Sequence, residues 1–125
     1  MKNLEIVGIV NAYTAQKEKS EGVKLPAAVA WKRRVNIDKL FKAKALIDEA
    51  LKEIHQKYSD DDHSEATEEG GRKVKAEYMT EFFREQGDIL AQETPVEISK
   101  VKIEDLGDVS LTDADMDTIA FMIED

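Results

Sequence analysis

Two clusters of charged side chains are the residues in this sequence best suited to binding chemistry. The first is basic and aromatic, and consists of Trp31, Lys32, Arg33 and Arg34. Tryptophan and arginine are over-represented among the side chains that dominate binding energy at protein interfaces. The cluster therefore predicts an anchor for a partner protein. The alternative is a solvated helix face that acids elsewhere in the chain neutralise.

The second cluster is acidic and lies between residues 59 and 71. Its six carboxylates belong to Asp60, Asp61, Asp62, Glu65, Glu68 and Glu69. The segment ends in two glycines and offers no large apolar side chain to bury, so we expect a flexible acidic loop. We predict that these six acids, together with Trp31, Arg33 and Arg34, form the partner-binding residues.

The acids near the C-terminus imitate the spacing of a calcium-binding loop without its turn. Asp113, Asp115 and Asp117 stand at the first, third and fifth positions, and Glu124 stands at the twelfth. The sixth position of such a loop needs a glycine, and here it is Thr118. We therefore expect no calcium site in this segment.

The sequence contains no recognisable catalytic motif. The chain has no cysteine, which excludes disulfides, thiolate nucleophiles and cysteine-based zinc sites. It has neither a glycine-rich phosphate loop nor a serine nucleophile motif. Of its two histidines, His55 falls on a helix surface and His63 in the acidic loop, where nothing fixes a metal geometry. We expect a protein that is not an enzyme and has no metal site or cofactor.

The charge is distributed unevenly along the chain. The net charge is −9, but residues 1–58 carry 12 Lys/Arg and 7 Asp/Glu, whereas residues 59–125 carry 6 and 20. The two halves could attract each other within one fold, or the acidic half could face a basic partner such as a nucleic-acid-binding protein. A net acidic chain is repelled by phosphates, so we expect no direct contact with nucleic acid.

One long helix is predicted from Pro26 to about Tyr58. Proline suits the first turn of a helix, and no glycine or second proline follows before Tyr58. Apolar residues recur there at alternating spacings of three and four, with Asn36 marking the place where a break would fall. The helix would span roughly 48 Å, more than the usual width of so small a domain. A homodimer through this helix is therefore an alternative, in which Lys44 within the apolar stripe would set the register.

Shorter elements are expected on both sides of the long helix. Asn3 can cap a helix that runs to about residue 18. The β-branched residues within 4–10 make a strand the alternative for that segment. Residues 20–22 are expected to form a turn. A third helix is predicted over 75–92, and alternating apolar residues predict a small β element near 95–103. Thr112 and Asp115 form the expected cap of a short final helix. The predicted fold class is α+β, mainly α, in a single domain over residues 1–125, with a long central helix packed by two or three shorter ones.

Several short segments occur in an order that is more specific than any one of them. They are Asn3-Leu4 with Ile9-Val10-Asn11, Lys24-Leu25-Pro26, Asn36-Ile37-Asp38-Lys39-Leu40, Gln56-Lys57-Tyr58, Val96-Glu97-Ile98, Ile103-Glu104-Asp105-Leu106, and Leu111-Thr112 with Phe121-Met122-Ile123-Glu124. In this order the chain resembles a family of small uncharacterised proteins of tailed phages and prophages of low-GC Gram-positive bacteria. Members usually carry an arginine-containing stretch where Ala45-Leu46-Ile47-Asp48-Glu49 stands here, and the loop after Tyr58 also differs. The resemblance implies a phage origin and action in the host cytoplasm, and it assigns no functional residue.

Two functions are therefore expected. The first is a phage protein that binds and inhibits a host or defence protein, for example an anti-CRISPR or another nuclease inhibitor. The alternative is a virion assembly factor or chaperone for the tail or head, with the long helix as its docking surface. A signal peptide and a membrane segment are not expected, because the apolar run of residues 119–123 is far shorter than the roughly 20 residues of a membrane span.

Overall fold

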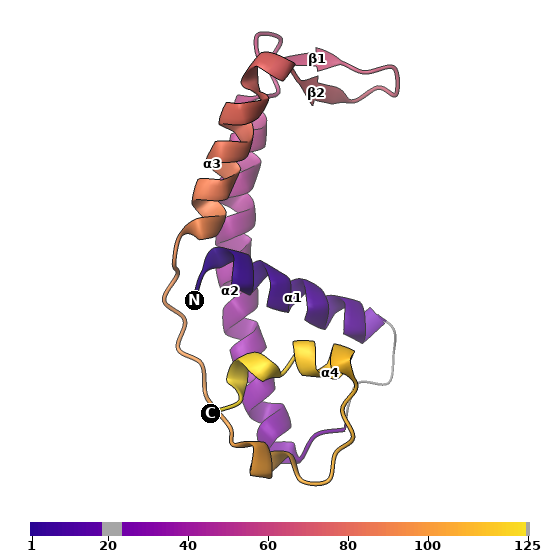
Figure 1. Cartoon of the computed structure of the whole chain (residues 1–125), viewed down its shortest axis with the longest axis vertical. Coiled ribbons are helices and arrows are strands. Elements are labelled where there is room, and N and C mark those ends of the chain that lie inside the picture. The colour runs from indigo at the N-terminus through magenta and orange to yellow at the C-terminus, as the bar shows by residue number, and fades with distance from the viewer. Residues whose placement is uncertain (19–23, 125) are drawn as a thin grey trace.

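A single long helix organises the computed structural model, which describes residues 1–18 and 24–124. This helix, α2 (Ala27–Lys57), runs without a break along much of the longest dimension of the molecule (Figure 1). Its 31 residues span roughly 46 Å at ~1.5 Å per residue. Pro26 stands immediately before the first turn. The predicted long helix is confirmed, and it is continuous through Asn36.

Asn36 explains why no break occurs there. The side chain is fully buried; its Nδ2 donates to the carbonyl of Ser99 at 2.9 Å and its Oδ1 accepts from the Ser99 backbone N–H at 2.8 Å. Asparagine is unfavourable inside a helix, because its side chain can form hydrogen bonds with nearby backbone groups in place of the helical ones. Here the nitrogen and the oxygen of the Asn36 side-chain amide both form hydrogen bonds with Ser99, which is distant in sequence. The side chain therefore does not compete with the backbone bonds of α2, and the helix continues through this position.

Two helices pack against α2 and form the main core. α3 (Met79–Ala91), entered through the 3₁₀ turn η1 (Ala76–Tyr78), lies alongside the second half of α2, and α1 (Asn3–Glu18) crosses its middle (Figure 1). The core between α1 and α2 consists of Ile6, Val10, Ile37, Leu40, Ala43 and Ile47. Residues 4–10 are therefore helical and form no strand. The alternating apolar spacing of α2 brings Ile37, Leu40 and Ile47 into this core.

Asn3 joins α1 to the end of α3, whereas the sequence suggested a cap on its own helix. Its Nδ2 donates to the carbonyl of Ile89 at 2.7 Å, and its Oδ1 accepts from the hydroxyl of Thr94 at 2.6 Å. The last carbonyls of a helix lack partners within that helix. Asn3 satisfies one of them in α3, which ties the beginning of the chain to residues 89–94.

The C-terminal segment closes over the first turns of α2. It contains the 3₁₀ turns η2 (Ile103–Leu106) and η3 (Ala120–Met122), with α4 (Asp113–Asp117) between them. A second core forms from Val29, Val101, Leu106, Ile119 and Met122. The predicted cap of the final helix is confirmed, because the Asp115 N–H donates to Thr112 Oγ1 and the Thr112 N–H donates to Asp115 Oδ2, each at 3.1 Å.

The small sheet lies in a different place from the predicted one. β1 (Ser64–Ala66) and β2 (Arg72–Val74) pair in antiparallel fashion, with Ser64 opposite Val74, and form a hairpin beyond the end of α2 (Figure 1). The sequence predicted a loop throughout 59–71, whereas β1 falls inside that range. The predicted class, α+β and mainly α, is confirmed.

The β element predicted near 95–103 is wrong. These residues run as extended chain along α2, and Val101 forms only an isolated bridge with Ile123. The alternation that suggested a strand has another cause. Val96 and Ile98 pack against the first core and Val101 belongs to the second, so these apolar side chains are covered without a neighbouring strand.

The turn predicted at 20–22 lies outside the described residues. Among the helices of the described chain, none is both long and apolar enough to cross a membrane.

Candidate partner-binding sites at the two ends of the long helix

The two predicted binding clusters lie at opposite ends of α2. Trp31, Arg33 and Arg34 belong to its first turns, and the acidic segment follows its last turn. Residues 33–57 rise roughly 36 Å along the helix. The structure therefore does not bring the basic and acidic residues together, and they cannot share one ligand of small size.

The acidic segment is attached to the helices by a cluster of aromatic rings. The His63 ring lies 5.4 Å from that of Tyr58 and 4.7 Å from that of Tyr78, measured between centroids. Tyr58 is buried and stacks edge-to-face on Phe82 of α3 at 5.4 Å. Edge-to-face aromatic pairs are favourable beyond the area they bury. The hairpin is thus seated on the ends of α2 and α3.

Two of the six acids hold the hairpin together internally. Asp60 Oδ1 accepts from the backbone N–H of His63 at 2.9 Å and lies 2.6 Å from the Nδ1 of that ring. These bonds hold the pKa of the Asp60 carboxyl below its ordinary value. Asp61 Oδ1 accepts from Arg72 Nη2 at 2.7 Å, and Arg72 Nε donates to the Ser64 hydroxyl at 2.8 Å. Asp60 and Asp61 therefore serve the local structure.

The other four acids face solvent. The side chains of Asp62, Glu65, Glu68 and Glu69 are exposed and form no hydrogen bond or ion pair with any residue of the described ranges. Glu65 stands opposite Lys73 in the register of the hairpin, which partly offsets its charge. The sequence alone treated all six acids alike, whereas the geometry separates two structural acids from four that remain available.

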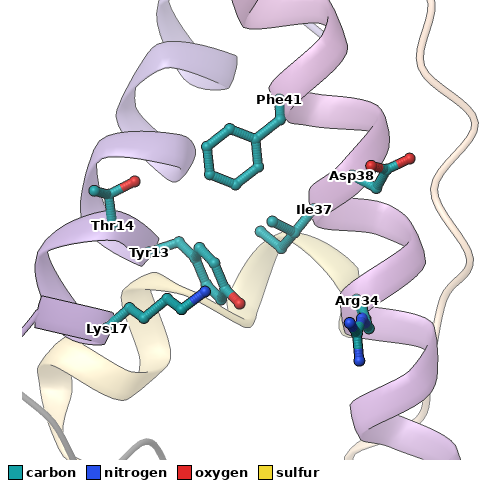
Figure 2. Close-up of a pocket in the computed structure, with 7 residues that line it drawn as sticks. All are labelled: Tyr13, Thr14, Lys17, Arg34, Ile37, Asp38 and Phe41. Carbon is teal, nitrogen blue, oxygen red and sulfur yellow. The ribbon is translucent and has the colours of Figure 1, made fainter.

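A groove lies at the other end, between α1 and the first half of α2. It has a volume of about 540 Å³ and is lined by Tyr13, Thr14, Lys17, Arg34, Ile37, Asp38 and Phe41 (Figure 2). A second hollow of about 360 Å³ shares Tyr13, Lys17 and Arg34 with it and adds Arg33. Lys17 and Arg34 therefore border a largely apolar groove, and Arg33 lies in the hollow beside it.

Tyr13 is the centre of this groove. The guanidinium of Arg33 lies over its ring at 5.1 Å from the centroid, and the Phe41 ring meets it edge-to-face at 6.2 Å. The Arg33 Nη1 is enclosed and has no hydrogen-bond partner within residues 1–18 and 24–124. Asp38, the acid of the lining, pairs with Lys42 at 3.0 Å. Asp38 therefore offsets the positive charge of Lys17 and Arg34 only weakly.

The groove contains only part of the predicted basic patch. Arg34 lines it and Arg33 lines the adjoining hollow, but Trp31 lines neither, and its side chain is 65% exposed. The sequence did not single out Tyr13, Lys17 and Phe41 as binding residues. Tyr13 and Lys17 stand four residues apart, which places them on one side of α1. Which face of α1 meets α2 depends on their packing, and no local pattern reveals that.

Attraction between the two halves of the chain is carried by few contacts. No ion pair in the described ranges joins residues 31–34 to an acid. Lys39 Nζ donates instead to the backbone carbonyl of Glu97 at 2.9 Å. Lys57 pairs with Glu85 at 2.6 Å across α2 and α3, which lowers the pKa of the Glu85 carboxyl. The basic patch is thus not neutralised by paired carboxylates in the described chain.

The acids that imitate a calcium loop have other contacts. Asp115 caps α4, and its Oδ1 also accepts a hydrogen bond from Gln16 Nε2. Thr118 is fully buried, and its hydroxyl donates to the carbonyl of Asp115 at 2.8 Å. Across the part of the chain that the structure describes, no three acidic or histidine side chains gather as a metal site would require.

Comparisons of the chain with protein-family models, with curated proteins and with solved structures give no match. The geometry of the two ends of α2 is therefore the basis for assigning a function.

Proposed function

We propose that this protein is a non-enzymatic binding protein that engages a basic partner protein through its acidic hairpin. One observation supports this most directly. Asp62, Glu65, Glu68 and Glu69 are exposed on a hairpin at one end of the molecule, without a hydrogen bond or ion pair to any described residue.

The construction of the hairpin suits electrostatic recognition. Asp60 and Asp61 use their hydrogen bonds to His63 and Arg72 to shape the segment, so that fewer conformations are lost on binding. Carboxylates gathered on one surface speed association with a cationic partner and repel nucleic acid. A cationic protein surface is therefore a more suitable partner than a phosphate backbone.

The resemblance to phage proteins favours a host or defence protein as this partner. Cationic surfaces of nucleases and other nucleic-acid-binding proteins exist to hold phosphates. A protein that covers such a surface with carboxylates would inhibit it by exclusion. Inhibition of a defence nuclease, as by an anti-CRISPR, is the specific form of this proposal.

A second candidate function rests on apolar side chains of the α2–α3 pair. Leu46 of α2 is 68% exposed and Phe83 of α3 is 57% exposed. A partner protein that buried these exposed apolar side chains would gain hydrophobic stabilisation. This alternative predicts that binding depends on Leu46 and Phe83 and not on the hairpin acids.

A capture experiment distinguishes the two candidates. Tagged wild-type protein is compared with the variant Glu65→Lys, Glu68→Lys, Glu69→Lys in lysate of a low-GC Gram-positive host. The matched control, Glu49→Lys, Glu53→Lys, Glu104→Lys, makes the same change in net charge at exposed acids away from the hairpin. We expect a basic protein that is enriched by wild type and control and lost with the hairpin variant. Equal enrichment by all three would refute the proposal, and loss with Leu46→Ser and Phe83→Ser would favour the assembly factor.

A further inference from the structure

We infer that the groove between α1 and α2 is a second binding site, which takes an acidic peptide segment carrying one apolar anchor side chain. This inference goes beyond the proposed function, because the groove and the acidic hairpin lie at opposite ends of α2 and have opposite charge.

The floor of the groove suits an apolar anchor. Ile37 forms its base and is only 4% exposed, whereas Phe41 beside it is 42% exposed. Figure 2 shows the Phe41 ring of α2 just above the Tyr13 ring of α1, with the Ile37 side chain beside them. The volume of about 540 Å³ falls within the range of ligand pockets and leaves room for more than one side chain.

The rim of the groove suits carboxylates. Lys17 and Arg34 are exposed and line it from α1 and α2 respectively. Arg33 adds a guanidinium on the Tyr13 ring, with one nitrogen that has no hydrogen-bond partner in the described chain. Guanidinium and ammonium groups form their strongest hydrogen bonds with carboxylates and phosphates. Asp38 also lines the groove, but its carboxylate pairs with Lys42, so these four side chains together keep a net positive charge.

The chemistry of the groove favours an acidic peptide over two other occupants, a nucleic acid and a second copy of this chain. A nucleic acid would place its charged phosphates against the apolar floor formed by Ile37 and Phe41, which gives them no hydrogen-bond partner. A second copy of this chain could offer its acidic hairpin, but residues 59–71 contain no apolar side chain larger than that of Ala66. An acidic segment with a phenylalanine or leucine satisfies both the rim and the floor.

The experiment uses the full chain and three short synthetic peptides. The first has glutamates around a single phenylalanine, the second replaces that phenylalanine by alanine, and the third replaces the glutamates by lysines. Binding is measured by calorimetry for wild type, for Arg34→Glu, for Phe41→Ala and for Lys52→Glu. Lys52 is an exposed cation of the same helix that does not line the groove, so its variant matches the change in charge. Circular dichroism establishes that each variant is folded.

We expect the first peptide to bind most tightly, and Arg34→Glu to weaken it about tenfold or more, as losing a charge-assisted hydrogen bond does. Lys52→Glu should change its affinity by less than about twofold, since exposed distant charges are screened. Phe41→Ala should abolish the preference for phenylalanine over alanine.

Three results would overturn the inference. The first is equal weakening by Arg34→Glu and Lys52→Glu, which would mean unspecific attraction. The second is an absence of binding by both acidic peptides. The third is self-association of the wild type that Arg34→Glu abolishes, which would make the occupant a second copy.

Discussion

Replacing Asn36 by alanine would test the contact that joins α2 to the extended chain after α3. The Asn36 side chain is fully buried, and its amide makes two hydrogen bonds with the backbone of Ser99, at 2.9 and 2.8 Å. It also lies 3.7 Å from the sulfur of Met122 in the second core. Alanine would leave one donor and one acceptor of Ser99 without these partners.

The size of the effect follows from these contacts. A buried polar group that loses its partner costs about 1–3 kcal/mol. Two such groups set an upper limit near ~6 kcal/mol, but Ser99 is only partly buried, so water can reach it after the substitution. We therefore expect the free energy of unfolding to fall by about 2–4 kcal/mol. That is a large part of the ~5–15 kcal/mol by which a domain is usually stable.

Urea unfolding followed by circular dichroism measures this change. The control is Asn11→Ala, on an exposed position of α1, which should alter the free energy of unfolding by no more than about 0.5 kcal/mol. If Asn36→Ala matched that control, the Asn36–Ser99 contact would have no structural importance, and our explanation for the continuity of α2 would be incorrect.

Three further predictions concern the hairpin and the glycines. The ¹³C titration of the Asp60 carboxyl should show a pKa below the ordinary value of an aspartate, because hydrogen bonds from the His63 ring and backbone lower it. The stability that these bonds give is present above the ordinary pKa and lost as the pH falls through the lowered pKa, and His63→Ala, which keeps the backbone bond, should raise the pKa of Asp60. A glutamate-specific protease should cut first after Glu68 or Glu69 in the exposed turn of the hairpin, and a first cut inside α2 would contradict this. In urea unfolding, Gly87→Ala should stabilise α3 by about 0.5–1 kcal/mol, since a Cβ there has open space. Gly107→Ala should instead destabilise by about 1–3 kcal/mol, because Gly107 has φ of 66° and ψ of −145°; effects of the same sign in both variants would contradict this assignment.

The helices could be predicted from the sequence because their signals are local. Pro26 and the alternating apolar spacing defined α2, and Thr112 with Asp115 defined the start of α4. The strands could not, since three-residue strands such as β1 carry no usable alternation. The hairpin depends instead on contacts of Arg72 and His63 with neighbouring acids. Residues 95–103 show the opposite case, in which alternation arose from packing against a helix.

The residues of the two candidate sites were predicted in part. Charge composition pointed to the hairpin acids and to Arg33 and Arg34, and these are placed at the two ends of α2. Composition could not show that Asp60 and Asp61 are used internally, because that depends on the fold of the segment. Nor could it show that Tyr13 meets Arg33, since α1 and α2 approach each other only in the tertiary structure.

The association rate of the captured basic partner, measured at two salt concentrations, tests the central proposal most directly. Attraction between exposed charges is screened with a Debye length of about 8 Å at physiological ionic strength. Wild type and the control Glu49→Lys, Glu53→Lys, Glu104→Lys should associate quickly in low salt and much more slowly in high salt. Glu65→Lys, Glu68→Lys, Glu69→Lys should associate slowly in both. An association rate that depends on neither salt nor the hairpin acids would contradict recognition through the acidic hairpin.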